Sequence, residues 1–472
     1  MLTLADALEA LTNSRPHADH IITEAAVDSR QVIPGALFVA LPGEKADGHN
    51  FIDAAFRRGA SFALIQRDVD ASFRTLDLRG GQMPDSMLTL DPPLCLRVDN
   101  SLSALQQIAR FWRRKLDLHV IGITGSVGKS STKEMVAEVL GMRYRTLKSP
   151  GNLNNEIGLP LSILRLGSGY ERAVLEMGFY VSGEIAFLCD IAQPSIGIVT
   201  NIGTVHAERA GSQEAIFTGK SELVQSLPPA PQGTAILNFD DPWVRKMEEK
   251  TRARIFFYGL SSEADLWADE IQGLGLDGIR FRLHYQSEIL HARVPLIGRH
   301  SVHTALRAAA AGLVEGLTWQ EIFEGLRQGN TQLRLVAVRS RTGALLLDDT
   351  YNASPESMLA AINLLDELEG RKIAVLGDML ELGPYERQGH EMVGLRAAHV
   401  ADVLITLGPR ARVIAETARK SGMSRSNIHE FDELEPIVAW LEKNLTSADA
   451  ALIKGSHGLR MDRIVAALEV SS

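Results

Sequence analysis

Residues 119–135 read HVIGITGSVGKSSTKEM, and this stretch decides the fold of the chain. The apolar residues from Val120 to Ile123 indicate the end of a buried strand, and Gly125 and Gly128 allow the backbone after it to turn tightly. From Ser130 to Leu140, apolar residues recur at helical spacing. The stretch therefore predicts a strand, a glycine-containing loop and a helix.

A loop of this kind is typical of a site that binds the phosphates of a nucleotide. Its backbone N–H groups and the positive end of the following helix point at an anion, Lys129 can reach the terminal phosphates, and a hydroxyl after the lysine can hold magnesium. We therefore predict a nucleoside triphosphate site. The candidate ATP-binding residues of the loop are Gly125, Ser126, Val127, Gly128, Lys129, Ser130 and Ser131.

The spacing of the loop is shorter than the general phosphate-loop pattern. Ile123 stands where that pattern has its first glycine. The segment Gly-x-x-Gly-Lys-Ser is also compatible with a glycine turn that caps an ordinary helix. The order of strand, loop and helix favours the nucleotide site.

Length and composition indicate a globular protein of several domains. A chain of 472 residues is too long for one hydrophobic core, so we expect roughly two to four domains. The net charge of −9 argues against a general nucleic-acid-binding protein, so any phosphate recognition must be local.

The sequence also predicts a cytoplasmic location. The two cysteines, Cys95 and Cys189, lie far apart and form no metal-binding or redox spacing, which fits a reduced compartment. The opening residues, MLTLADALEALTN, contain no basic region followed by an apolar core, and no run of about 18 apolar residues occurs. We therefore expect neither a signal peptide nor a membrane span, and we expect a monomer.

The predicted fold class is α/β, with three domains. Residues 1–116 form a small N-terminal α/β domain, residues 117–331 a central mononucleotide-binding domain with a parallel sheet around the phosphate loop, and residues 332–472 a C-terminal Rossmann-like domain. In the first domain we expect a strand over Ala36–Leu41 and a helix over Phe51–Arg58.

Polar residues follow the predicted strands of both large domains, at the point where each strand ends. In the central domain these residues include Glu176, Asn201 and Asn238, and in the last domain they include Asp349 and Lys454. Because ligands bind at the carboxyl ends of parallel strands, we expect these residues to converge on the phosphate loop. A buried carboxylate such as Glu176 beside a triphosphate usually binds a cation.

In their order along the whole chain, several segments resemble the Mur ligase family of cell-wall peptide synthetases. The loop ITGSVGKSST has that family's short form, which explains the missing glycine. The other segments are SPGNLNNEIGLPLS, LEMG, TNIGTVHAERAGS, LNFDDP, GRH, DDTYNASP, VLGDMLELG and KGS. DDTYNASP and GDMLELG favour the type that adds a dipeptide over the type that adds the third residue, whose Asp-Asn-Pro-Arg segment is absent here.

The resemblance implies an ATP-dependent amide ligase of peptidoglycan precursor synthesis. Its reaction would join the carboxylate of UDP-N-acetylmuramoyl-tripeptide to the amine of D-alanyl-D-alanine, with ATP cleaved to ADP and phosphate. Because a carboxylate is a poor acyl donor, ATP would first convert it to an acyl phosphate, which the amine then attacks. Every reacting oxygen is negative, so catalysis would depend on Lys129, on magnesium ions and on a water-poor cleft.

The resemblance also implies the catalytic candidates. Ser130, Glu176 and His206 look like magnesium-site residues, and Lys220 matches a lysine that family members carry as a carbamate, an anion able to hold magnesium. Together with Lys129 they would form the catalytic set. From the residues alone, His206 is also compatible with a polar surface histidine, and Lys220 with a solvated helix lysine.

Further candidates would bind the nucleotide from the central and the closing domains. Those that look like nucleotide contacts are Asn201 and Asn238, then Arg334, Asp349, Tyr351 and Asn352.

The substrate candidates fall in three groups. Ser29 and Arg30 of the DSR segment resemble a uridine-diphosphate recognition element, with an arginine in a surface turn as the alternative. The muramoyl-peptide channel would be lined by Asn152, Asn154 and Asn155. The carboxylate of the incoming dipeptide would meet Lys454, Ser456 and the loop through Arg460.

One departure from the family pattern follows GRH. Relatives usually read GRHNxxN, whereas here Ser301 and Thr304 occupy the places of the asparagines. Each hydroxyl can keep one hydrogen bond, so we expect altered detail and retained activity.

Two other functions stay open at this point. A related amide ligase of the folylpolyglutamate or cyanophycin type would not need a UDP-sugar. A nucleotide-controlled switch would use the loop without ligation, but the chain has no Asn-Lys-x-Asp base-recognition motif.

Overall fold

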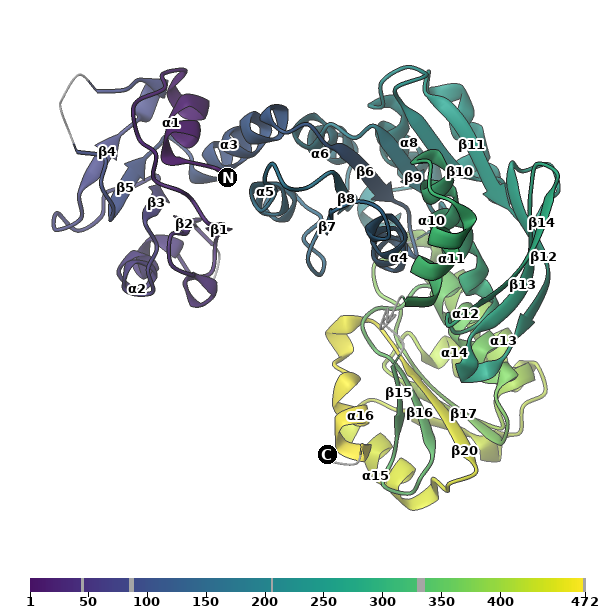
Figure 1. Cartoon of the computed structure of the whole chain (residues 1–472). Coiled ribbons are helices and arrows are strands. Elements are labelled where there is room, and N and C mark those ends of the chain that lie inside the picture. The colour runs from purple at the N-terminus through teal and green to yellow at the C-terminus, as the bar shows by residue number, and fades with distance from the viewer. Residues whose placement is uncertain (44–45, 85–88, 205–206, 329–335, 470–472) are drawn as a thin grey trace.

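The computed structural model describes residues 1–43, 46–84, 89–204, 207–328 and 336–469. It contains three α/β domains, each built on its own sheet, which confirms the predicted fold class (Figure 1). His206 and Arg334 lie outside the described residues. Within the described part of the chain, no helix has the length and the apolar composition needed to cross a membrane.

The N-terminal domain is a five-stranded parallel sheet in the order β1-β2-β3-β5-β4. Its strands are β1 (Ala25–Ala26), β2 (Leu37–Val39), β3 (Phe62–Ile65), β4 (Thr75–Asp77) and β5 (Leu94–Arg97), and its helices are α1 (Leu4–Thr12) and α2 (Ile52–Arg57). The predicted helix over Phe51–Arg58 begins one residue later, because Phe51 ends a preceding 3-10 turn. The predicted strand over Ala36–Leu41 is also shorter at both ends.

Helix α3 (Ser101–Lys115) connects the N-terminal domain to the central domain. It contacts α1 of the first domain and, in the central domain, α5 (Gly158–Leu164) and α6 (Glu184–Ala192). The indole N–H of Trp112 donates to the carbonyl of Leu166 at 2.8 Å. This helix therefore packs against both domains and holds them together.

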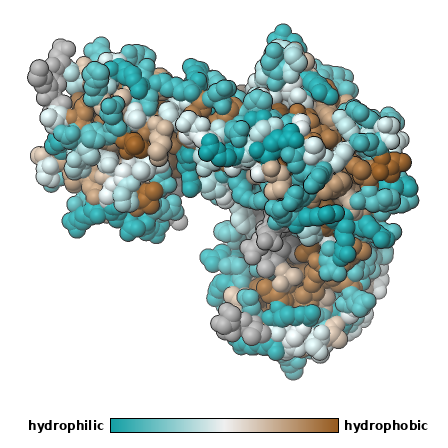
Figure 2. Space-filling model, in the orientation of Figure 1, coloured by the Kyte–Doolittle hydropathy of each residue, from teal (hydrophilic) through white to brown (hydrophobic). Residues whose placement is uncertain are grey.

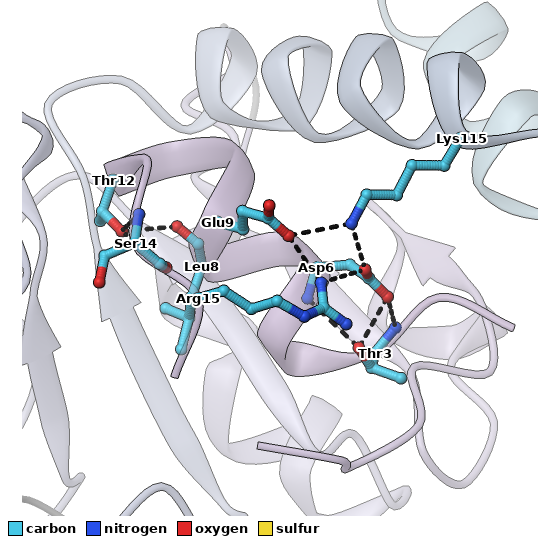
Figure 3. A network of polar contacts seen from close by, with 8 residues as sticks. All are labelled: Thr3, Asp6, Leu8, Glu9, Thr12, Ser14, Arg15 and Lys115. Carbon is cyan, nitrogen blue, oxygen red and sulfur yellow. Dashed lines mark hydrogen bonds and ion pairs between the residues drawn. The ribbon is translucent and has the colours of Figure 1, made fainter. Parts of the chain in front are cut away.

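A network of charged residues fastens α1 to the end of α3 (Figure 3). Lys115 Nζ lies 3.0 Å from Asp6 Oδ1 and 2.9 Å from Glu9 Oε2, and Arg15 lies 2.8 Å and 2.6 Å from the same two carboxylates. Burial alone would raise the pKa of Asp6, but hydrogen bonds from Arg15, Thr3 and Lys115 outweigh it and hold the pKa below its ordinary value. Asp6 is therefore kept ionised at this junction.

The central domain is a nine-stranded sheet in the order β14-β13-β12-β11-β10-β9-β6-β8-β7. The strands from β7 to β12 are parallel, and β12, β13 and β14 pair antiparallel and extend one edge. No prediction covered this antiparallel extension. The strands are β6 (His119–Thr124), β7 (Thr146–Lys148), β8 (Arg172–Glu176), β9 (Ile196–Val199), β10 (Thr234–Asn238), β11 (Arg254–Gly259), β12 (Leu266–Gly273), β13 (Ile279–Tyr285) and β14 (Glu288–Val294).

Helices cover both faces of the central sheet. One core contains residues of α4, α10 and α11, and a second contains residues of α3, α5, α6 and α8. Those not yet given bounds are α4 (Lys129–Gly141), α7 (Ala207–Ala210), α8 (Gln213–Gln225), α9 (Pro242–Arg245), α10 (Val302–Val314) and α11 (Trp319–Gln328). Because β6 is buried between these two layers, it delivers the phosphate loop at the carboxyl edge of the sheet.

The C-terminal domain is a six-stranded sheet in the order β15-β16-β20-β17-β18-β19, with only the edge strand β15 antiparallel. The strands are β15 (Val336–Arg339), β16 (Leu345–Asp349), β17 (Arg371–Gly377), β18 (Val403–Leu407), β19 (Ile428–Phe431) and β20 (Asp449–Lys454). The helices α12 (Pro355–Glu367), α13 (Glu386–Val400) and α14 (Arg412–Lys420) cover one face, and α15 (Leu434–Asn444) and α16 (Asp462–Leu468) cover the other. This doubly wound arrangement is the predicted Rossmann-like one.

The three domains are not equally close to one another. In the space-filling view, the N-terminal domain joins the rest of the molecule through a narrow neck, whereas the central and C-terminal domains form one body (Figure 2). The phosphate loop lies in that body, where the two larger domains meet.

Candidate active site

A cleft with a volume of about 350 Å³ lies between the central and C-terminal domains. Its central-domain wall contains the loop from Ser126 to Ser131, and its C-terminal wall contains the end of β16 and the start of α12. The predicted residues that line the cleft are Ser126, Val127, Gly128, Lys129, Ser130, Ser131, Asn201, Asn238, Asp349, Asn352 and Lys454. The convergence expected from the strand ends is therefore present.

The phosphate loop is held in shape by the end of β9. Val127 N donates to Asn201 Oδ1 at 2.9 Å, and Thr200 Oγ1 donates to the carbonyl of Val127 at 2.6 Å. Gly125 has a φ of 143°, and a Cβ added there would lie 1.8 Å from Thr200 Oγ1, so only glycine fits. Asn201 thus acts on the loop itself as well as lining the cleft.

Two lysines meet at one carbonyl of this loop. Lys129 Nζ donates to the Gly125 carbonyl at 2.8 Å, and Lys220 Nζ, from α8, donates to the same oxygen at 3.1 Å. Lys220 is completely buried, and its ammonium nitrogen lies 4.9 Å from the ring centroid of Phe179. Burial, and then the charge of Lys129, lower the pKa of Lys220 well below its ordinary value, so its amine is easily deprotonated.

Glu176 connects the loop helix to the neighbouring strand end. Its side chain accepts from Ser130 Oγ at 2.7 Å and from Asn154 Nδ2 at 2.9 Å, and the residue is only 1% exposed. Carboxylate and hydroxyl oxygens are the ligands that magnesium prefers, so Ser130 and Glu176 fit a Mg²⁺ ion bound to phosphate oxygens. Among the described residues, no group of three or more His, Cys, Asp or Glu side chains could hold a metal, so substrate oxygens or further groups would have to complete the shell.

Asn238 has a mainly structural set of bonds at the end of β10. Its Nδ2 donates to the carbonyl of Thr200 at 3.1 Å, and its Oδ1 accepts from Asp240 N at 3.1 Å. It is 7% exposed and lines the cleft. It therefore holds β9 and β10 together beside the loop.

On the opposite wall, Lys454 and Asp349 form an ion pair. Lys454 Nζ lies 2.7 Å from Asp349 Oδ2 and donates to the carbonyl of Asn352 at 2.9 Å. Lys454 is 1% exposed, so this pair is fixed within the wall. Tyr351 is 39% exposed and lies beside His457 rather than among the residues that line the cleft.

Comparison with known proteins agrees with this geometry. The family model "Mur ligase middle domain" matches residues 123–312, "Mur ligase, glutamate ligase domain" matches residues 333–457, and "Mur ligase family, catalytic domain" matches residues 21–82. A protein of Bacillus subtilis (strain 168) named UDP-N-acetylmuramoyl-tripeptide--D-alanyl-D-alanine ligase is 33% identical, and the match covers 98% of this chain and 96% of that protein. The Escherichia coli (strain K12) protein of the same name is 32% identical, with 99% and 98% covered.

The chain belongs to the Mur ligase family.

Solved structures support this assignment. A crystal structure of MurF from Acinetobacter baumannii has a TM-score of 0.83 and 30% identity, with 98% of this chain and 97% of that chain covered. A MurF ligase from Thermotoga maritima, solved in complex with ADP, has a TM-score of 0.79 and 28% identity, with 95% and 97% covered. The family predicted from the ordered motifs is therefore confirmed.

Most of the substrate candidates of this Mur ligase lie away from the cleft. Arg30 is ion-paired with Asp28 at 2.7 Å, and both it and Ser29 belong to the N-terminal domain. Asn155 Oδ1 accepts from the backbone N–H of Gly158, the first residue of α5, at 2.9 Å. Of the asparagine group, Asn154 reaches the site through Glu176, whereas Asn152 is exposed.

The candidates of the last domain also separate. Ser456 is buried, and its Oγ accepts from Leu380 N at 2.9 Å. Arg460 is ion-paired with Asp462 at 3.1 Å and is largely exposed. Neither lines the cleft that Lys454 lines.

Several cleft residues of this Mur ligase were not predicted as site residues. They are Thr200, Ile297, His300, Ser301, His303, Thr304, Arg307, Ala353, Ser354, Glu356, Ser357, Ala360 and Ala361. Ser301 and Thr304 drew attention only as departures from a pattern. Arg307 carried a usable signal, because it is a single charged residue inside the run ALRAAAA.

Proposed function

We propose that this chain is an ATP-dependent peptide ligase that joins D-alanyl-D-alanine to UDP-N-acetylmuramoyl-tripeptide. The names of the relatives that match nearly the whole chain support this substrate pair. The observation that carries the proposal is a phosphate loop that lines the cleft and to which Glu176, through Ser130, and the buried Lys220 are hydrogen-bonded.

The chemistry follows from the need to activate a carboxylate. A carboxylate oxygen of the tripeptide attacks the terminal phosphorus of ATP, the bond to the bridging oxygen breaks, and ADP leaves. The amine of the dipeptide then attacks the acyl phosphate carbonyl, loses a proton, and expels phosphate from the tetrahedral intermediate. Negative charge is present throughout, so Lys129 and the loop N–H groups act by neutralising and positioning it.

Magnesium belongs to this proposal. Ser130 and Glu176 are the described residues that would hold it, and His206, outside the described residues, is the expected third. When bound, the ion would neutralise phosphate oxygens during transfer. The chain's own part is to hold the Ser130 hydroxyl against the Glu176 carboxylate beside the loop.

A carbamate on Lys220 also belongs to it. Addition of CO₂ to an unprotonated lysine amine releases a proton and gives an anionic carbamate. The burial of Lys220 and its lowered pKa favour the unprotonated amine that this reaction needs. The product would replace a neutral amine next to Lys129 with an anion that can share a magnesium ion.

The remaining candidates keep their predicted places in the proposal. Asn201 and Asn238 border the nucleotide on the central side, and Asp349 and Asn352 border it on the other. Arg334 and Tyr351 stay predicted contacts of the closing domain.

The muramoyl-peptide would approach past Asn154 and a second pocket of about 230 Å³ that Asn155, Tyr180 and Phe187 line. Its uridine end would reach Ser29 and Arg30. The dipeptide carboxylate would reach the region of Lys454, Ser456 and Arg460, where each cation would exchange its present carboxylate partner for the ligand.

Phosphate release tests the proposal. We expect release only when ATP, UDP-N-acetylmuramoyl-tripeptide and D-alanyl-D-alanine are all present, with a new amide product seen by mass spectrometry. Lys129→Ala, which removes the loop cation, should lower the rate by about a hundredfold or more. Release that is indifferent to the dipeptide would contradict the ligase, and release that needs no UDP-peptide would contradict the substrate.

A further inference from the structure

Arg307 lies on α10 and lines the cleft next to the phosphate loop. It is 6% exposed, although the residues around it in the helix are mostly alanine. A Cβ added to Gly128, the last loop residue before α4, would lie 3.3 Å from one of its terminal nitrogens. The guanidinium therefore lies beside Gly128 of the predicted phosphate cradle.

The side chain is poorly satisfied for a buried arginine. One terminal nitrogen donates to Thr304 Oγ1 at 2.9 Å, and the guanidinium carbon lies 5.8 Å from the ring centroid of Tyr258. Its Nε is buried without a hydrogen-bond partner, and within the described ranges no carboxylate forms an ion pair with it. A buried charge without a counter-charge is costly, so this position needs an anion that the chain itself does not supply.

Arg113 shows what a purely structural buried arginine looks like in the same molecule. It is 7% exposed, and its guanidinium donates to the carbonyls of Ala192, Leu116 and Leu118 at 2.8, 2.9 and 3.1 Å. Those acceptors satisfy the donors of Arg113 without any ligand. Arg307 instead interacts with the hydroxyls of Thr304 and Tyr258, leaves its Nε without a partner and faces a cleft.

We propose that Arg307 binds the diphosphate of the nucleotide as a second fixed cation beside Lys129. The inference rests on the proposed function, because it requires a nucleotide in this cleft. A guanidinium presents a planar set of donors that matches phosphate oxygens, and Thr304 holds that plane by accepting one of its hydrogen bonds. The Thr304 hydroxyl thus orients the arginine that supplies the donors.

Calorimetric titration of the full chain with ADP and with adenosine tests this role. Arg307→Gln removes the charge and keeps part of the polarity, so ADP should bind about tenfold more weakly, whereas adenosine, which has no phosphate, should bind within about twofold of the parent. Arg307→Lys keeps a charge without the planar fork and should lose about threefold to tenfold for ADP alone. The parent affinity for ADP should also fall more steeply with salt than that of the glutamine variant.

Arg254→Gln is the matched control, because Arg254 is an exposed arginine on β11 of the same domain, away from the cleft residues. It should leave both affinities unchanged. Thermal unfolding shows whether each variant is folded. If Arg307→Gln does not fold, the ADP affinity of Arg307→Lys tests the phosphate-binding role instead. Unchanged ADP affinity, or an equal loss for ADP and adenosine, would overturn the phosphate-binding role and assign Arg307 to packing. A parent chain that does not bind ADP would instead overturn the proposed function.

Discussion

The central-domain wall of the cleft and the DSR turn of the N-terminal domain are built in opposite ways. In the wall, side chains are largely withdrawn from solvent and held by fixed hydrogen bonds, as the Ser130 hydroxyl is by the Glu176 carboxylate and the Asn201 amide by the backbone N–H of Val127. In the turn, the Arg30 side chain is 87% exposed and bonds to its neighbour Asp28. The difference teaches that the proposed chemistry rests on a preorganised surface, whereas the proposed recognition of the distant substrate end rests on side chains that remain available to a ligand.

The largest expected effect that tests this contrast comes from Lys220→Met. We expect ligation to fall by about a hundredfold or more, because the variant cannot form the anionic carbamate beside the loop. Short-chain carboxylic acids should restore part of the rate of Lys220→Ala, whose smaller side chain leaves room for them. Full activity of either variant without added acid would show that Lys220 is not a catalytic residue.

Although Lys220→Met should lower activity, we expect it to raise the stability of the folded protein at lower pH. In bicarbonate-free buffer the folded protein has a lowered Lys220 pKa, so the unfolded chain binds more protons between that pKa and the ordinary lysine value. Stability of the parent should therefore rise with pH across this window, and Lys220→Met should remove that rise and be the more stable protein at the lower end. Urea unfolding at several pH values measures both.

Glu176→Gln should give the next largest effect. The amide can still accept from Ser130 and keeps the shape of the site, but it lacks the charge that a cation needs. We expect the magnesium concentration for half-maximal ligation to rise about tenfold, with melting temperature little changed. An unchanged magnesium requirement would show that this carboxylate serves only to position Ser130.

Arg30→Ala sharpens the other side of the comparison. Because its partner is a neighbouring residue in an exposed turn, its loss should alter folding stability by less than about 0.5 kcal/mol. If the turn recognises the uridine-diphosphate end, KM for the UDP-peptide should rise about tenfold, with kcat and KM for ATP unchanged. Arg57→Ala, an exposed arginine paired within α2, is the matched control.

The smallest effect is expected from Asn201→Ala. It removes one hydrogen bond to the loop, so ADP affinity should fall by about threefold to tenfold without loss of the fold. If Asn201→Ala lowered ADP affinity as much as Lys129→Ala does, the conformation of the loop would depend entirely on the bond from Asn201.

Local patterns predicted the parts of the site that are close in sequence or at strand ends. Glycines and helical spacing within one short stretch were enough to predict the loop and α4. The contact between Glu176 and Ser130 was expected because both residues lie at the carboxyl edge of the same sheet. The antiparallel strands β13 and β14 were missed, since their pairing depends on partners rather than on a local motif. Arg307 stands out in the sequence as a single charge inside the run ALRAAAA, but its position beside Gly128, which is distant in sequence, follows only from the fold.

The crowded position of Gly125 limits which amino-acid substitutions this part of the cleft can tolerate during evolution. A methyl group there would collide with Thr200, whose hydroxyl also bonds to the loop, so a single substitution at either place disturbs the other. Few resistance substitutions would therefore be tolerated against an inhibitor that binds the main-chain groups of this loop. An inhibitor that binds the exposed Arg30 would not have this advantage.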